Sequence, residues 1–99
     1  VRINGFRFTW DGAKAQGNEQ KHGVSFAEAQ TVFFDEDALF MADPDHSEDE
    51  ERFLLLGLSA RLRFLVVCHC VREEEEIRII SARKATKKER GQYESKVRA

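Results

Sequence analysis

Residues 77–86 read Ile-Arg-Ile-Ile-Ser-Ala-Arg-Lys-Ala-Thr, and this stretch decides how the rest of the chain is interpreted. Its first half is apolar enough to be a buried β-strand, and its second half holds the cations Arg83 and Lys84. Thr86, followed three residues later by Glu89, has the spacing of a helix capping box. Guanidinium and ammonium groups neutralise phosphoryl charge. The stretch therefore predicts either a phosphate site or a solvated pair of loop cations.

Apolar runs and helix-start signals continue this pattern along the chain. Asp11 has the position of a helix N-cap, and Ser25 with Glu28 forms a second capping box. We expect strands over residues 6–10, 38–42, 52–59, 64–71 and 76–82, and helices over residues 12–21, 25–34 and 87–97. The order β-α-α-β-β-β-β-α predicts an α+β fold, an antiparallel sheet with two N-terminal helices and a C-terminal helix.

The length of 99 residues predicts a single domain over residues 1–99. A chain of this size buries roughly 60–70% of its unfolded surface, which is enough for one modest core. No apolar run is long enough to cross a membrane and no signal-peptide pattern is visible, so we expect a cytosolic protein that does not bind membranes.

The charges are unevenly distributed along the chain. The net charge is only −2, but residues 35–51 hold nine acidic residues and no lysine or arginine. From Arg78 to the end there are eight basic residues and two acidic ones. A basic surface can bind a polyanion even when the whole chain is slightly acidic.

Cys68-His69-Cys70 is a cluster of possible metal ligands in the sequence. The spacing is not that of a zinc knuckle, and the chain has no further cysteine to complete four ligands. Neighbours two apart on a strand are also poorly placed for a disulfide. We therefore interpret both cysteines as core residues and expect no metal and no cofactor.

The histidines and carboxylates suit RNA cleavage without a metal. The 2′-hydroxyl must lose a proton and the leaving 5′ oxygen must gain one. His46 or Glu50 is the candidate base, and His69 or Lys21 is the candidate acid or positioning group. The alternatives are a solvated acidic loop for His46 and a hydrogen-bonded core histidine for His69. His69 shares a sheet face with Arg78 only if the connection between residues 71 and 77 is even-numbered.

Cations borne on strands or strand ends are held rigidly, so they suit stabilisation of the charged transition state. The alternative is that they form ion pairs with the surplus of acidic residues. Arg83 is the first candidate and is assigned to the catalytic residues, and Arg63 is the second candidate for neutralising the phosphate charge. The candidate substrate-binding residues are Lys21, Arg52, Arg61, Arg63, Arg78 and Lys84.

The chain resembles the BrnT family of toxins from bacterial type II toxin–antitoxin systems. The resemblance extends from residue 8 to residue 93, nearly the whole chain. It is carried by residues 8–11, 18–26, 43–46, 50–52 and 77–86, together with Glu89-Arg90 and Tyr93-Glu94. Polar residues that match those shared in the family are Lys21, His46, Glu50, Arg52, His69 and Arg83. The acidic run at residues 73–76 departs from the family pattern, and its charge would repel phosphate.

The resemblance implies a RelE-like fold and a ribonuclease that inhibits translation. It also implies a cognate antitoxin, usually of the ribbon-helix-helix type, through which the complex would contact DNA and could form a dimer of toxin–antitoxin pairs. The competing hypothesis is a non-catalytic module that acts with an antitoxin as an operon co-repressor. A third hypothesis is a metal-dependent nuclease that uses His46 and the neighbouring acids.

Overall fold

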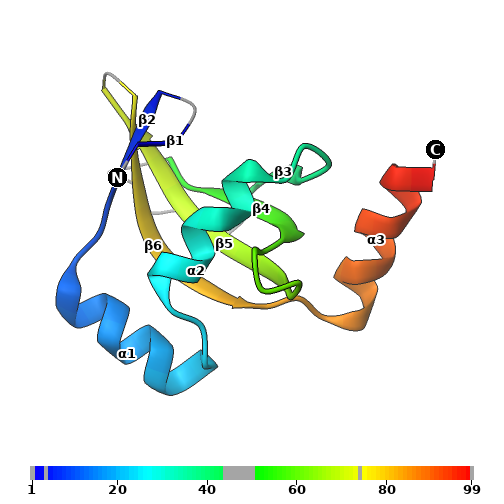
Figure 1. Cartoon of the computed structure of the whole chain (residues 1–99), viewed down its shortest axis with the longest axis horizontal. Helices are drawn as coiled ribbons and strands as arrows, with labels where there is room; N and C mark the ends of the chain where they lie inside the picture. The colour runs from blue at the N-terminus through cyan, green and yellow to red at the C-terminus, as the bar shows by residue number, and fades with distance from the viewer. Residues whose placement is uncertain (1, 4, 44–50, 74, 99) are drawn as a thin grey trace.

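The computed structural model describes residues 2–3, 5–43, 51–73 and 75–98, and they form one mixed sheet flanked by helices (Figure 1). The strands are β1 (Arg2–Ile3), β2 (Phe6–Thr9), β3 (Leu39–Ala42), β4 (Phe53–Leu58), β5 (Phe64–Arg72) and β6 (Glu76–Lys84). The helices are α1 (Gly12–His22), α2 (Phe26–Gln30), the 3-10 helix η1 (Thr31–Phe34) and α3 (Lys87–Arg98). Within the described residues, no helix is long and apolar enough to cross a membrane.

The strands lie in the order β1-β2-β6-β5-β4-β3, so β6 and β5 are central and β4 lies between β5 and the edge strand β3. The expectation of a wholly antiparallel sheet is wrong at one pair, because β2 and β6 are parallel. The connections between consecutive strands from β3 to β6 are short, so these strands must alternate in direction. β2 and β6 are far apart in sequence, so they can pair in either direction. The short strand β1 was also not expected.

Capping side chains set the helix boundaries. Asp11 accepts hydrogen bonds from the backbone of Ala13 and Lys14 at 2.8 and 3.1 Å, and α1 ends at Gly23 in the left-handed conformation (φ 68°). The hydroxyl of Thr86 accepts from the Glu89 amide, and the Glu89 carboxylate accepts from the Thr86 amide, at 3.2 and 2.8 Å. The capping box expected at the start of α3 is confirmed.

The second expected helix is shorter and tighter than the sequence suggested. The α-helix stops at Gln30 and continues as a 3-10 turn to Phe34. Ser25 caps α2 by accepting from the Glu28 amide at 3.0 Å. The Glu28 carboxylate, however, binds side chains of the β4–β5 turn, so only half of this capping box forms.

A bulge in β6 decides which of its residues face each side of the sheet. Cys68 pairs with Ser81 and His69 pairs with Ile79, so Ile80 is the extra residue on β6. The bulge lets Ile79 and Ala82, three residues apart, face the same side. Without it, regular alternation would turn one of them to the other face.

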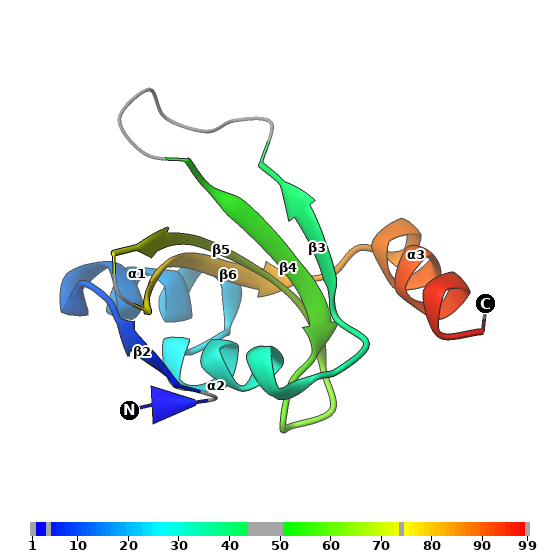
Figure 2. The same cartoon turned by 90° about the horizontal axis from the view of Figure 1, so that it is seen from above.

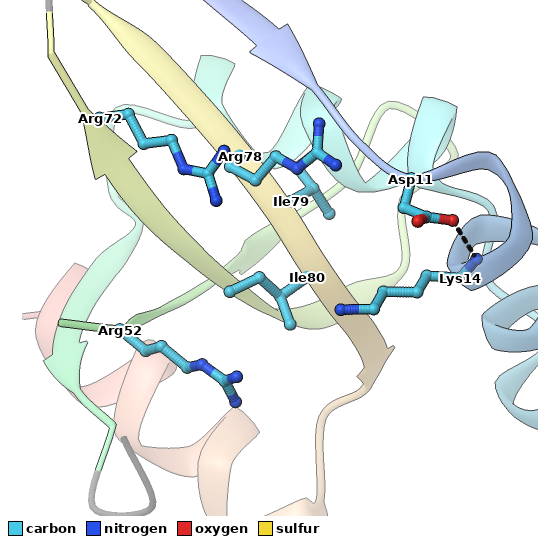
Figure 3. Close-up of a pocket in the computed structure, with 7 residues that line it drawn as sticks. All are labelled: Asp11, Lys14, Arg52, Arg72, Arg78, Ile79 and Ile80. Atoms are coloured by element: carbon cyan, nitrogen blue, oxygen red, sulfur yellow. Dashed lines mark hydrogen bonds between the residues drawn. The ribbon is translucent and has the colours of Figure 1, made fainter. Parts of the chain in front are cut away.

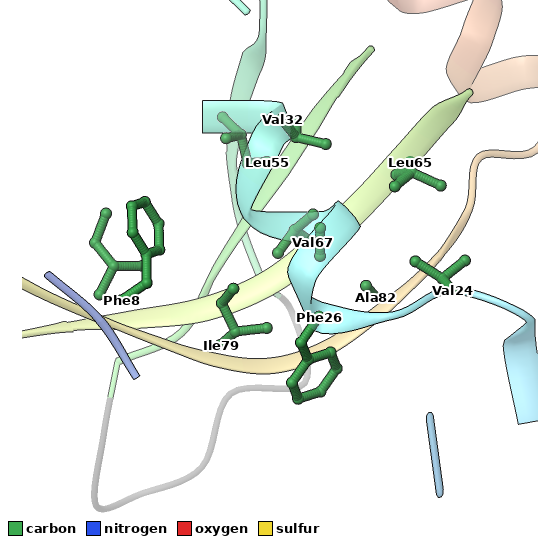
Figure 4. Packing of buried hydrophobic residues seen from close by; sticks show 11 residues of the cluster. Phe8, Val24, Phe26, Val32, Leu55, Leu65, Val67, Ile79 and Ala82 are labelled. Atoms are coloured by element: carbon green, nitrogen blue, oxygen red, sulfur yellow. The ribbon is translucent and has the colours of Figure 1, made fainter. Parts of the chain in front are cut away.

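The two faces of the sheet carry separate cores. On the face that α1 and α2 cover, the α1–α2 face, Val24 and Phe26 pack against Val67, Ile79 and Ala82 of the central strands (Figure 4). The opposite face, the α3 face, carries the smaller cluster around Leu56, Val66 and Tyr93. Figure 2 shows α1 and α2 together on one side of the sheet and α3 beyond its end. Among the described helices, α3 is the one that packs on this face, and it contacts β4.

The exposed edge of β6 is completed by one side chain. β2 pairs only with the first three residues of β6, so no strand of the described residues pairs with the edge beyond Arg78. The Asn18 side chain accepts from the amide of Ala82 at 3.0 Å and donates to the carbonyl of Ala82 at 2.8 Å. Asn18 therefore takes the place of a neighbouring strand and fixes α1 beside β6.

Candidate functional site

A cavity of about 120 Å³ lies on the α3 face where β6, the end of β5 and the start of α1 meet (Figure 3). Four cations line it, from four different segments of the chain. We name this site the arginine pocket, and its lining residues are Asp11, Lys14, Arg52, Arg72, Arg78, Ile79 and Ile80. Several positive charges in one cavity attract a multiply charged anion such as a nucleic-acid backbone.

Sheet register places two of these cations. Arg78 pairs with Cys70, so it shares the α3 face with Cys70 and with Arg72, two residues further along β5. Arg52 precedes β4 and enters the pocket from the side opposite Lys14 (Figure 3). Its Nε is buried and has no hydrogen-bond partner within the described parts of the chain. A buried donor without an acceptor is the group that an anion in the pocket would satisfy.

Asp11 is the single acidic residue among the described residues that line the pocket. Its carboxylate accepts from the backbone amides of Lys14 and Ala13, which lower its pKa, and the charges of Lys14 and Arg78 lower it further. The carboxylate therefore stays ionised and is a weak base. Its main effect is to hold the start of α1, and with it Lys14, against β6.

Arg83 also faces the α3 side, but its charge is already matched. It donates two hydrogen bonds to the Glu89 carboxylate, at 2.8 and 2.9 Å. This bidentate pair lowers the pKa of Glu89 to about 2. Arg83 joins the end of β6 to the first turn of α3, and a phosphate at this position would compete with Glu89.

The geometry of Arg63 and Arg61 favours the ion-pair alternative. The Glu28 carboxylate is buried and accepts hydrogen bonds from Arg63 Nε at 2.9 Å, from Arg63 Nη2 and from the Ser59 hydroxyl at 2.7 Å. Arg61 lies 3.8 Å from the same carboxylate and is mostly exposed. The hydrogen bond from Arg63 lowers the pKa of Glu28, so the carboxylate is charged and holds the β4–β5 turn on α2.

His69 lies in the interior, on the α1–α2 face. Val71 pairs with Ile77, so the connection between them is odd-numbered and His69 faces away from Arg78. Its exposed fraction is 0%, and the rings of Phe33 and Phe40 stand edge-on to it at 4.9 and 5.5 Å. Burial lowers the pKa of His69. The position matches the core-histidine alternative.

The remaining candidates are spread over the molecule. Lys21 is exposed in the last turn of α1, seven residues after Lys14 and hence on the same side of the helix, about 10 Å along its axis. Lys84 lines a different cavity, near the start of α3. His46 and Glu50 lie outside the described residues, and so do Asp45, Glu48 and Asp49, which are the acids nearest His46 in the metal-nuclease hypothesis.

Sequence reasoning missed Lys14 and Arg72 as members of the pocket. Lys14 lies three residues after an N-cap, a position that usually signals only a solvated first turn. A signal was available in its placement beside Asp11, because an N-cap at the end of a strand brings the first helical turn back to the sheet. Arg72 is the last residue of β5 and directly precedes the acidic run 73–76. The acidic run indicated a solvated turn, so Arg72 was not recognised as a strand residue.

Fold and pocket together define a small α+β protein with a cation-lined sheet face, a class suited to binding the phosphates of a polyanion. Residues 10–89 match the family model described as the ribonuclease toxin, BrnT, of type II toxin–antitoxin systems. The chain therefore belongs to the BrnT family of ribonuclease toxins.

A solved structure supports the same assignment. The chain is similar to the ribonuclease toxin BrnT of Brucella abortus, with a TM-score of 0.63 and 25% sequence identity over 83% of this chain and 99% of that one. No curated protein matches the chain. The family expected from the sequence, and the α+β fold with its N-terminal helices and C-terminal helix, are confirmed.

Proposed function

We propose that this chain is a metal-independent endoribonuclease that inhibits translation and is neutralised by a cognate antitoxin. The observation that carries the proposal is the convergence of Lys14, Arg52, Arg72 and Arg78 in one cavity of a ribonuclease-toxin fold. Two or more of these cations can contact one phosphodiester, which bears a single negative charge. Arg52 and Arg78 would then stabilise the second charge that develops as the phosphorus becomes five-coordinate.

The reaction balances without a metal or an oxidant. The 2′ oxygen bonds to the adjacent phosphorus while the bond from phosphorus to the 5′ oxygen breaks. One proton leaves the 2′-hydroxyl and one joins the 5′ oxygen, giving a cyclic phosphate and a free 5′-hydroxyl. His46 or Glu50, which shortly precede Arg52 in the chain, is assigned as base on the sequence alone. Lys21 is retained as a candidate positioning group, whereas the buried His69 has no proton-transfer role in the proposal.

One observation favours the competing function, a non-catalytic module that binds an antitoxin and represses its operon. Among the described residues that line the arginine pocket there is no histidine, and the carboxylate of Asp11 is a weak base. A pocket that binds phosphate without proton transfer would bind RNA and leave it intact. The two functions therefore differ in one measurable result.

The test is cleavage of RNA by the purified chain in the presence of EDTA. We expect cleavage to cyclic-phosphate products, and Arg52→Ala and Arg78→Ala should each lower kcat/KM by about 10²-fold. The matched control is Lys88→Ala, an exposed cation of α3 outside the pocket, which should leave the rate nearly unchanged. Intact RNA, with tight binding to the product of the adjacent gene, would support the non-catalytic module. Cleavage that EDTA abolishes would support the metal-dependent alternative.

A further inference from the structure

A second cationic cavity, of about 290 Å³, lies at the other end of β6, beside the start of α3. We name it the α3 pocket, and its lining residues are Leu62, Arg63, Phe64, Lys84, Ala85 and Arg90. From this cavity we infer that the chain binds single-stranded RNA across two separate phosphate subsites, the arginine pocket and the α3 pocket. The inference rests on the proposed function, since it extends the RNA site of that function.

The three cations of the α3 pocket differ in the partners that they already have. Arg63 is committed to Glu28. Arg90 lies over the ring of Phe64, with 5.1 Å between its guanidinium carbon and the ring centroid, and this contact leaves the edge of the guanidinium free to donate. Within the described residues, neither Arg90 nor Lys84 has a carboxylate partner. Lys84 and Arg90 are therefore the two charges available to a phosphate.

The arginine pocket and the guanidinium of Arg90 are reached from the same face of the sheet, whereas Lys84 pairs with Leu65 of the α1–α2 face and lines the α3 pocket at the end of β6. Phe64 and Cys70 lie an even number of residues apart on β5, so Phe64, with Arg90 over it, faces the same side as Arg78. Arg83, which pairs with Val66, faces this side between the two pockets. From Arg78 to Lys84 the strand rises about 20 Å, which a strand of roughly four nucleotides would span, the lower end of known single-strand site sizes.

An anionic strand explains the two pockets together better than an acidic protein segment does. Along β6, residues 78–84 carry three cations and no acidic residue, so the path between the pockets is cationic at both ends, while Glu89 matches the charge of Arg83 between them. A polyphosphate backbone presents one charge per nucleotide at regular intervals and can follow such a path. The acidic residues that flank this path, Glu76 at the start of β6 and Glu89 in α3, are paired with Arg7 and Arg83.

The test compares two lengths of 2′-O-methyl RNA, which binds but cannot be cleaved because its 2′ oxygen carries no proton. The double variant Lys84→Ala/Arg90→Ala should weaken binding of an oligonucleotide of about eight nucleotides by about tenfold and leave binding of a dinucleotide unchanged. Loss of two phosphate contacts should also reduce the slope of log K against log salt by about 1.4. The charge-matched control Lys87→Ala/Lys88→Ala, on the same helix outside the pocket, should change neither.

Three other results would contradict the inference, and each would point to a different explanation. Equal losses for both lengths, or equal losses in the control, would mean a general charge effect and not a second subsite. Unchanged RNA binding with weakened antitoxin binding would assign the pocket to a protein partner. Lys84→Ala alone guards against misfolding, because within the described residues the Lys84 side chain makes no hydrogen bond or ion pair; it should show part of the same length-dependent loss. If wild-type protein cleaves RNA while the double variant binds normally, the inference fails and the proposed function stands.

Discussion

Arg63 and Arg61 both direct a guanidinium group at Glu28, but their surroundings differ. The Arg63 side chain is 26% exposed and forms hydrogen bonds with the carboxylate, whereas Arg61 is 72% exposed at 3.8 Å. Ionised Glu28 is itself only 3% exposed at its side chain. A buried charge depends on its closest partner, and exposed pairs contribute little.

The first prediction follows from this difference. Arg63→Ala should lower the free energy of unfolding by about 3 kcal/mol, because it leaves a buried carboxylate unpaired. Arg61→Ala, which removes the same charge a short distance away, should cost less than about 1 kcal/mol. Urea unfolding of both variants measures the two losses in the free energy of unfolding. Equal losses would show that Glu28 responds to net charge and not to the specific hydrogen bonds of Arg63.

His69 is a second residue whose surroundings decide its behaviour. Its Nδ1 lies 3.2 Å from the carbonyl oxygen of Val67, which can only accept, so Nδ1 carries the proton of the neutral ring. Its Nε2 is buried without a hydrogen-bond partner among the described residues. Protonation would place an unpaired charge among aromatic rings, and for this reason the pKa of the folded form lies below the ordinary 6.5.

The second prediction is a loss of stability in mild acid. Below pH 6.5 the unfolded chain binds a proton at His69, whereas His69 in the folded chain stays neutral because its pKa is lower. The free energy of unfolding should therefore fall by up to about 1.4 kcal/mol for each pH unit by which the solution is made more acidic. The His69→Gln variant should show a flatter dependence between about pH 7 and about pH 5.5. The His22→Gln variant, which keeps His69, should retain the wild-type slope. A steep slope in both variants would assign the effect to other groups.

At the scale of elements, β4 and η1 approach each other closely at Gly57. A Cβ atom there would lie 2.9 Å from Val32 Cγ1 and 3.1 Å from Asp35 Oδ2. The Asp35 carboxylate accepts from the Leu58 amide at 2.8 Å and from the Tyr93 hydroxyl at 2.7 Å. Glycine therefore makes room for the carboxylate that anchors α3 to the sheet. Burial and the Asp35 charge raise the pKa of Tyr93 to about 12, so this hydroxyl remains a donor.

The third prediction tests this approach with two glycines. Gly57→Ala should destabilise the fold by about 2 kcal/mol, because the new methyl group displaces Val32 or Asp35. Gly91→Ala, in α3 with no atom within 4 Å of the added carbon, should stabilise it by up to about 1 kcal/mol through helix propensity. Thermal unfolding of both variants checks the sign. A neutral Gly57→Ala would mean that η1 can move away from β4.

The elements themselves were largely predictable from local patterns. β5 and β6 were expected because apolar runs end at turn residues, and α1 and α3 because Asp11 and Thr86 have the chemistry of N-caps. The bulge at Ile80 and the parallel pairing of β2 were not. Both depend on contacts between segments distant in sequence, which a local pattern does not record.

At the scale of the whole molecule, the position of each cation in the fold determines what it can do. The basic C-terminal part supplies Arg78 to one pocket and Lys84 and Arg90 to the other. Lys14 joins Arg78 only because Asn18 fixes α1 beside β6. The excess of basic residues after Arg78 indicated a polyanion site, but tertiary contacts divided those residues into bound and available charges.

The sequence by itself determined the family, the α+β class and the stretch 77–86 as the strand that carries cations to a helix start. These depend on periodicity, capping and residue identity, which are local properties. Only the tertiary structure decided that Arg83 and Arg63 are paired, that His69 is enclosed and that Lys14 and Arg72 belong with Arg52 and Arg78. The reason is that the sequence gives the identity of a charged residue but does not show whether a carboxylate forms an ion pair with it in the folded protein. Its partner is set by register, burial and the packing of distant segments.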